Sequence, residues 1–335
     1  MKLKTGLFFL LALSLTISCS SPEGEESALK KIFSDDTLPP ANGGILDILV
    51  VAEDKVWNGG PGRAFEEHFI GMVYGLPQPE PRYTVRQVAP KEFSDLLKRS
   101  RYIVLLDAKA DSSSLVFEMD KWARGQMVTH LSAPTELDLR KLTLKQTEAI
   151  DARISALESK RLYTKMEPLT HKEYPEFFSK HNLKLNVPRD FALSVSTDDV
   201  VVYWKTTTLA DNGIIIYVGD LPEDEAIIGN NIIPLRDSLT KLYVPGQRDG
   251  SYMITEDLVK PQLNPTEVQG RFSIEARGLW RTHGDIMGGP FVSYTIYDEE
   301  NNRLIYIDSF ILAPEKKKRK SLFELESIIR NLEIL

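Results

Sequence analysis

The chain has 335 residues, of which 42 % are hydrophobic and 27 % charged, and its formal net charge is −7. This composition is typical of a globular protein and excludes a chain that is disordered or membrane-spanning throughout. The excess of acidic residues also argues against nonspecific binding to nucleic acid or to anionic lipid headgroups.

The first part of the chain has the pattern of a secretory signal peptide. Two lysines precede an apolar run, residues 6–17, which is too short for an ordinary membrane-spanning helix. A serine stands directly before Cys19, as at bacterial lipoprotein cleavage sites, although Thr16 replaces the usual leucine three places before the cysteine. We predict removal of residues 1–18 and lipidation of Cys19. The alternative is an ordinary signal peptide with an incidental cysteine.

Cys19 is the only cysteine in the chain. The processed protein would therefore contain no thiol, disulfide or cysteine metal ligand, and its stability would depend on a hydrophobic core. Processing also removes two lysines, which leaves 39 basic and 48 acidic residues and a net charge of −9. We expect a protein of the cell envelope, anchored in the outer membrane on its periplasmic or surface face by N-terminal acyl chains.

Residues 19–43 are rich in Ser, Glu, Asp and Pro and are predicted to form a flexible tether. The N-terminal half, residues 44–134, follows it. Its signals alternate as strand, helix, strand, helix, strand and end in a hairpin, which favours a partly parallel sheet with right-handed crossovers. We expect strands at 45–53, 82–88, 101–107, 115–121 and 126–132, and helices at 61–72 and 90–100.

A long helix, residues 135–166, is predicted to join the two halves, because apolar residues recur on one of its faces. The C-terminal half is residues 167–335. The fold is expected to be α+β, with two α/β sandwich-like halves that contain antiparallel or mixed sheets. The expected elements of the second half are a helix at 171–180, strands at 183–187, 200–206 and 213–219, a helix at 232–243, loops at 244–270, a three-stranded meander at 271–314 and a final amphipathic helix.

Several segments resemble one family. VWNGG and YGLPQPEP (residues 56–60 and 74–81), NVPRDF (186–191) and GLWRTHGDIMGGPFVSYTIYDEENNRLIYIDSFILAP (278–314) are similar to a family of Bacteroidetes lipoproteins known only as a domain of unknown function. The resemblance covers nearly the whole processed chain and implies lipid anchoring, but it supplies no activity, cofactor or catalytic residue. The topology of the second half also resembles the small α/β sandwich of Mog1-like and PsbP-like proteins, a likeness that does not fix function.

The end of the predicted parallel sheet is the first candidate site, because ligands gather beyond the carboxyl ends of parallel strands. Three carboxylates there would suit a hard cation, and a glycine-rich helix start could hold an anion. The loop matches neither a phosphate-binding lysine loop nor a dinucleotide fingerprint, and the alternative is an ordinary helix start with acidic turn residues. The residues are Glu53, Asp54, Gly59, Gly60, Gly62, Arg63 and Asp107.

The meander offers two further candidates. A histidine near a carboxylate can act as a general base or supply two metal ligands, although in a glycine-rich loop it is more often a turn residue. Aromatic residues that alternate along the strands could form a binding surface for a peptide, a glycan or an envelope protein, or they could pair across strands inside the core. The candidate binding residues are Trp280, Arg281, His283, Asp285, Tyr294 and Tyr306.

No nucleophile elbow or HExxH motif is present, and we assign no catalytic residue, no metal ligand and no cofactor. We predict a non-enzymatic binding or assembly module of the cell envelope. The alternative is an envelope hydrolase or a metal-dependent enzyme. That alternative requires His283 and Asp285, or the three acids of the sheet end, to meet in one concave pocket.

Overall fold

The computed structural model describes residues 38–221 and 228–335. The predicted signal peptide, Cys19 and most of the predicted tether lie outside this range. The last tether residues are part of the fold, since Pro40 pairs with Arg124 and Asn42 with Ser100 in isolated bridges. Residues 39–335 make up one unit of the structure. Within the described ranges, no helix combines the length and the apolar character needed to cross a membrane.

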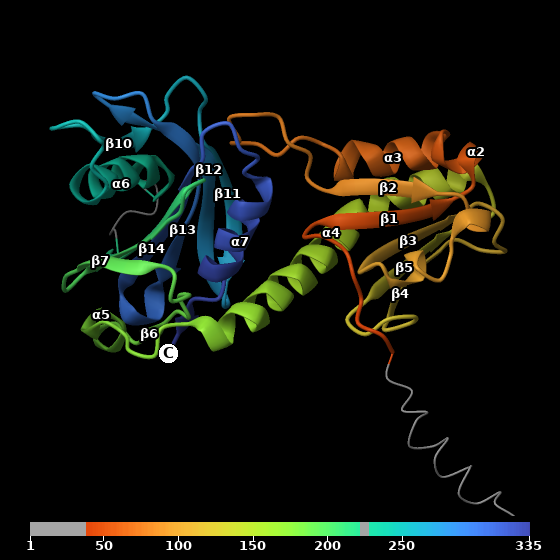
Figure 1. Ribbon diagram of the computed structural model, residues 1–335, viewed down its shortest axis with the longest axis horizontal. Coiled ribbons are helices and arrows are strands. Elements are labelled where there is room, and N and C mark those ends of the chain that lie inside the picture. The colour runs from red at the N-terminus through yellow and green to blue at the C-terminus, as the bar shows by residue number, and fades with distance from the viewer. Residues whose placement is uncertain (1–37, 222–227) are drawn as a thin grey trace, which may run out of the picture. The chain divides into compact units, whose positions relative to one another are not determined.

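The N-terminal half contains the predicted, mostly parallel sheet (Figure 1). Its strand order is β2-β1-β3-β5-β4, and only the β4–β5 hairpin pairs antiparallel. The chain visits one side of β1 and then the other, which creates a topological switch point between β1 and β3. The strands are β1 (Asp47–Ala52), β2 (Thr84–Val88), β3 (Tyr102–Asp107), β4 (Ser114–Met119) and β5 (Met127–Ser132).

Helices α2 (Asp54–Trp57), α3 (Gly60–Phe69) and α4 (Glu136–Met166) complete this half. Phe65 and Phe69 of α3 and Ile150 of α4 pack in one buried cluster with the strands. The prediction of a helix at 90–100 is wrong, because this segment forms two 3-10 turns, η1 (Pro90–Glu92) and η2 (Leu97–Arg99). Ser94 and Asp95 interrupt it, and such residues compete with a short helix for backbone hydrogen bonds.

Helix α4 confirms the predicted long helix. Thr135 begins it, since its Oγ1 accepts the backbone N–H of Asp138 (3.2 Å), and two acidic residues in the first turn suit the helix dipole. Its 31 residues span about 46 Å. Met166, at its last turn, packs against the cores of both halves. The helix therefore belongs to both cores.

The C-terminal half is built on an antiparallel sheet with the order β10-β12-β13-β14-β9-β8-β7, and β11 also pairs with β12. The predicted meander is confirmed as β12, β13 and β14, and the predicted hairpin as β8 and β9. The strands are β7 (Ala192–Ser196), β8 (Val200–Thr206), β9 (Asp211–Asp220), β10 (Tyr252–Thr255), β11 (Gln262–Val268), β12 (Arg271–His283), β13 (Gly288–Asp298) and β14 (Arg303–Leu312).

Helices cover both faces of this sheet (Figure 1). Helix α6 (Ile228–Tyr243) lies on one face, and α5 (Glu176–Lys180) and α7 (Arg319–Ile329) pack on the other. A two-stranded sheet pairs β6 (Leu183–Lys184) with β15 (Glu333–Ile334), and η3 (Glu167–Leu169) and η5 (Glu299–Asn301) are 3-10 turns. The α+β fold with two α/β sandwich-like halves is thus confirmed.

Two predictions for this half need correction. The helix expected at 171–180 is limited to α5, and the segment 244–270, expected to be loops, contains β10 and β11. Prolines and glycines suggested loops there, but Pro265 lies in β11, which pairs only with β12. An edge strand tolerates proline because it has an unpaired side.

Candidate functional site

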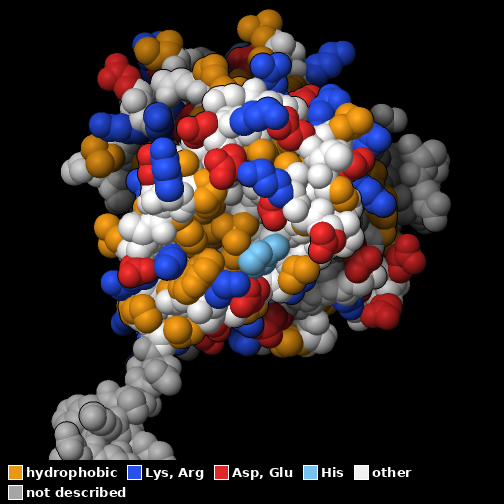
Figure 2. Space-filling model, turned by 90° about the vertical axis from the view of Figure 1, so that its right-hand side faces the viewer, with side chains coloured by type: hydrophobic (Ala, Val, Ile, Leu, Met, Phe, Trp, Pro, Cys, Tyr) orange, Lys and Arg blue, Asp and Glu red, His pale blue; other side chains and the backbone are white. Residues whose placement is uncertain are grey.

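The three acids predicted at the end of the parallel sheet do lie at neighbouring strand ends, because β1 and β3 are paired in parallel. Glu53, Asp54 and Asp107 are all exposed, and Asp107 accepts the backbone N–H of Lys109 (2.9 Å) as a turn residue does. Over the described ranges, no three His, Cys, Asp or Glu side chains are grouped as a metal ion would require. Figure 2 shows the side where α2 lies, and acidic and basic side chains are mixed across it.

The glycines of the same loop have a packing role. A Cβ on Gly62 would lie 1.8 Å from the carbonyl oxygen of Trp57, and one on Gly59 would lie 2.8 Å from that of Lys55. A Cβ on Gly60 would meet the Arg140 side chain at 2.8 Å. The tight corner between α2 and α3 therefore accounts for Gly59 and Gly62, whereas Gly60 faces the Arg140 side chain of α4, and Arg63 is exposed beside them.

His283 and Asp285 are not brought together. The His283 ring stacks on Tyr252 (5.0 Å between centroids), whereas Asp285 lies 3.7 Å from Arg248 Nε and accepts the backbone N–H of Ile286. Among the described residues no hydrogen bond or ion pair joins the two side chains. Neither the His283 and Asp285 pair nor the three acids of the sheet end therefore supports the enzyme alternative.

The predicted aromatic surface is wrong for three of its members. Trp280, Tyr294 and Tyr306 are buried in the core of the C-terminal half, so they are unavailable to a partner. Cross-strand packing inside the core, the alternative that the sequence left open, is what the structure contains. His283 is the exposed member of the candidate set, and Arg281 is partly buried with Glu256 and Asp257 each 3.8 Å away.

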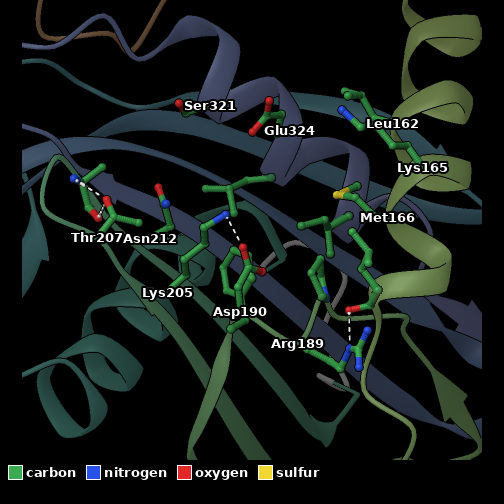
Figure 3. A pocket seen from close by; sticks show the side chains of 16 residues that line it. Leu162, Lys165, Met166, Arg189, Asp190, Lys205, Thr207, Asn212, Ser321 and Glu324 are labelled. Atoms are coloured by element: carbon green, nitrogen blue, oxygen red, sulfur yellow. Dashed lines mark hydrogen bonds and ion pairs between the residues drawn. The ribbon is translucent and has the colours of Figure 1, made fainter.

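A cavity of about 610 Å³ lies where the C-terminal end of α4 meets the C-terminal half (Figure 3). This volume is within the range of small-molecule sites. Leu162 and Met166 of α4 line one side of it, and Leu325 and Ile328 of α7 line another. Further lining residues come from the segment 188–191 and from the β8–β9 hairpin, and they include Pro188, Phe191, Lys205, Ala210 and Asn212.

One ion pair fixes the edge of this pocket. Lys205 Nζ lies 2.6 Å from Asp190 and 5.5 Å from the centroid of the Phe191 ring. These contacts hold the segment 188–191 against β8, as Figure 3 shows for Lys205 and Asp190. Lys205 is therefore paired with Asp190, and the same lysine also lies near Glu324.

Two hydrogen-bond acceptors in the pocket lack a partner within the described part of the chain. Glu324, which projects from α7, takes part in no hydrogen bond or ion pair there, and burial raises the pKa of its carboxyl against the opposing effect of Lys205 and Lys165. The Oδ1 atom of Asn212 is buried without a donor. Glu324 is partly buried, whereas the unpaired Asn212 oxygen is fully buried and costs free energy that a ligand with a donor would recover.

Sequence reasoning missed this pocket. Arg189, Asp190 and Phe191 belong to the NVPRDF segment, whose sequence signal is its resemblance to the lipoprotein family. The apolar lining residues of α4 and α7 have the spacing of ordinary core positions. The one available signal was Glu324, a carboxylate beside the apolar stripe of the last helix.

Both halves match families of unknown function. Residues 41–167 match the family described as Domain of unknown function (DUF8532), and residues 170–331 match Domain of unknown function (DUF4837). The two matches meet just beyond the end of α4. No curated protein matches the chain.

Among solved structures, the Ran-binding protein Mog1p of Saccharomyces cerevisiae is similar at 13 % identity and a TM-score of 0.32, over 45 % of this chain and 89 % of that one. A Mog1 mutant is similar at 14 % identity and a TM-score of 0.31, over 45 % and 90 %. The lipid transfer and protein localization domain of human StarD13 has 10 % identity and a TM-score of 0.22, over 41 % and 88 %. Two adjacent parts of the chain thus match two families that are both described as of unknown function.

Proposed function

We propose that this protein is a lipid-anchored binding protein of the bacterial cell envelope, as in the Bacteroidetes lipoproteins that its sequence resembles. Its ligand is an amphipathic molecule with an apolar body and a cationic or N–H donor head. Cys19 is the lipidated residue, and the pocket at the end of α4 is the binding site. The observation that carries this proposal is the unpaired Glu324 carboxylate in an otherwise largely apolar pocket.

The chemistry of the lining supports this class of ligand. Leu162, Phe191, Leu325 and Ile328 are buried apolar side chains that can cover a hydrocarbon chain or an apolar peptide side chain. A donor on the same molecule can then reach Glu324. An ammonium group suits this position best, because a charge-assisted hydrogen bond to a carboxylate is stronger than a neutral one.

Titration calorimetry with decylamine and decanoate tests the preference, since the two probes share a chain length and differ in the head. We expect the wild type to bind decylamine roughly ten- to hundred-fold more tightly than decanoate, the range that one charge-assisted hydrogen bond provides. Glu324→Gln should abolish the preference and retain binding of the chain. Glu267→Gln, at an exposed position of β11, is the matched control and should bind as the wild type does.

Two results would overturn the binding proposal. One is equal affinity of the wild type for the two probes, and the other is an unchanged preference in Glu324→Gln. The exposed Lys165 at the rim favours decanoate, so a preference for the amine cannot come from the rim charge alone.

Lipid anchoring is tested separately. We expect an alkyne-tagged fatty acid to label the wild-type protein in cells and to leave Cys19→Ala unlabelled, because Cys19 is the only cysteine available for acylation. Cys19→Ala should also leave the membrane fraction, whereas Ser20→Ala should be labelled and retained. Labelling and membrane retention of Cys19→Ala would contradict the anchor and would leave the binding proposal intact.

A further inference from the structure

A second cavity, of about 630 Å³, lies between the two halves and has a mainly polar lining. Side chains reach it from α3, α4 and the residues before β2 on one side, and from β11, β12 and α7 on the other. Its most prominent feature is a group of four arginines, Arg82, Arg277, Arg319 and Arg330. We call it the arginine cleft.

Two carboxylates of the C-terminal half are fully engaged in the cleft. Glu326 accepts a hydrogen bond from Arg277 Nη1 (2.8 Å), and Glu275 accepts from Arg277 Nε (2.7 Å) and from the Tyr294 hydroxyl (2.6 Å). Arg330 Nε donates to the same hydroxyl oxygen (2.8 Å). Burial opposes ionisation of Glu326, but the surrounding guanidinium groups outweigh it and lower the pKa of its carboxyl to about 2.

The N-terminal half contributes one further carboxylate that is equally engaged. Asp151 of α4 accepts hydrogen bonds from the Tyr83 hydroxyl and from Arg82 Nη1 (3.1 Å), and it lies 2.9 Å from His68 Nε2. Burial raises the pKa of this carboxyl. The hydrogen bonds from Tyr83 and His68 and the charge of Arg82 lower the pKa by more than burial raises it, so the net shift is downward. Three carboxylates, one buried and two partly buried, therefore face four arginines.

Arg319 is the arginine left without a strong partner. Its Nη1 atom lies 3.7 Å from Glu326, which Arg277 already binds at 2.8 Å. The Nε and Nη1 atoms of Arg319 are buried, and neither has a hydrogen-bond acceptor within the described residues. Burial, with the nearby positive charges of Arg277 and Arg82, lowers the pKa of this guanidinium.

We propose that the arginine cleft binds the anionic group of a ligand, a carboxylate or a phosphate, through Arg319 and Arg82. Arg82 also has an Nε atom without an acceptor among the described residues, and its side chain is 42 % exposed, so it can turn toward a ligand. Arginine is the side chain best suited to both anions, because its planar fork donates two parallel hydrogen bonds.

The remaining lining residues define the rest of the ligand as polar. Gln262 and Asn264 of β11 face the cleft with exposed amide groups, and Glu148 stands at its edge. Glu148 repels an anion at the rim, so the anionic group belongs at the inner end, beside Arg319. This site therefore differs in chemistry and in place from the apolar pocket, and neither proposal depends on the other.

Thermal unfolding and titration calorimetry with inorganic phosphate and with succinate test the proposal, at an ionic strength held constant with chloride. We expect at least one of the two anions to raise the unfolding temperature of the wild type above that in chloride. Arg319→Gln should weaken binding of that anion roughly ten- to hundred-fold, the loss expected for one charged hydrogen-bond donor. The anion that binds distinguishes a phosphate ligand from a carboxylate ligand.

Two further variants keep the test decisive. Arg82→Gln changes a side chain that is 42 % exposed, so it should disturb the fold less than Arg319→Gln does, and it should weaken binding in the same direction. Arg248→Gln removes an arginine that is 69 % exposed and lies outside the cleft, so it should bind as the wild type does. The proposal is overturned if neither anion stabilises the wild type beyond chloride, or if Arg82→Gln binds as tightly as Arg248→Gln.

Discussion

Arg236 and Asp308 form an ion pair inside the core of the C-terminal half, where both side chains are fully buried. Arg236 Nε lies 3.1 Å from Asp308 Oδ2, and its guanidinium stacks 3.8 Å from the centroid of the Phe291 ring. Burial raises the pKa of Asp308 to about 6 even though Arg236 opposes the shift. The free-energy cost of desolvating the carboxylate therefore exceeds the free energy gained from its attraction to the arginine, a common outcome for buried pairs.

This raised pKa predicts an unusual pH dependence of stability. Between about pH 4 and about pH 6 the native state keeps a proton on Asp308 that the unfolded chain has released, so this group's contribution to the free energy of unfolding falls as pH rises. From about 1.4 kcal/mol per pKa unit, we expect a loss on the order of 3 kcal/mol between about pH 4 and about pH 7, relative to Asp308→Asn.

Urea unfolding of both proteins across this range measures the difference. Asp257→Asn, at a side chain that is 80 % exposed, is the control and should show the pH dependence of the wild type. Parallel stability curves for the wild type and Asp308→Asn would contradict the raised pKa.

At the scale of elements, helix α7 begins with a cap from the other half of the molecule. Glu80, at the end of the proline-rich loop that follows α3, is buried and accepts the backbone N–H groups of Lys318 (2.6 Å) and Arg319 (3.2 Å). Lys318, the residue before the helix, provides no side-chain cap. A carboxylate at this position satisfies free N–H groups and interacts favourably with the helix dipole.

We expect Glu80→Ala to destabilise the protein by about 2 kcal/mol, the upper range for loss of a helix cap. Hydrogen exchange should accelerate at the amides of Lys318 and Arg319, because these groups lose their acceptor. Gln78→Ala changes an exposed residue of the same loop and should leave both measurements unchanged. Equal stability of the two variants would show that Glu80 does not cap the helix.

Sequence patterns predicted the elements whose signals are local. Strand β1 is apolar on both faces and is buried on both, and Thr135 marks the start of α4 by the side chain that caps it. The strands β10 and β11 were missed, because they owe their conformation to pairing with β12 rather than to their own residues. Edge strands with proline and glycine have little local signal.

At the scale of the whole molecule, both proposed sites lie where segments distant in sequence meet. The apolar pocket needs α4, the segment 188–191, the β8–β9 hairpin and α7, and the arginine cleft needs both halves. Glu324 and Arg319 belong to the predicted final amphipathic helix and its start, and they look like solvated charges in the sequence. The packing of α7 against α4 and the large sheet partly buries both residues.

The two halves are held together by the same proline-rich loop that caps α7. Leu76 of this loop packs against the core of the C-terminal half, and Phe323 of α7 packs in the core of the N-terminal half. Between them Gly75, with a φ of +77°, lies against the backbone of Gly278 in β12. A Cβ on Gly75 would be 3.1 Å from the backbone nitrogen of Gly278.

Gly75→Ala tests how strongly this contact couples the halves, and Gly270→Ala is its matched control. Both glycines have nearly the same positive φ (+77° and +78°), so alanine meets the same backbone strain at each, about 1–2 kcal/mol. Only Gly75 adds a steric contact with backbone, because a Cβ on Gly270 would meet nothing within 4 Å. We expect Gly75→Ala to lose roughly 1–3 kcal/mol more than Gly270→Ala in chemical denaturation, as overpacking does. If the two variants lose the same stability, the loop yields to the added methyl group and the halves are held by α4 and α7 instead.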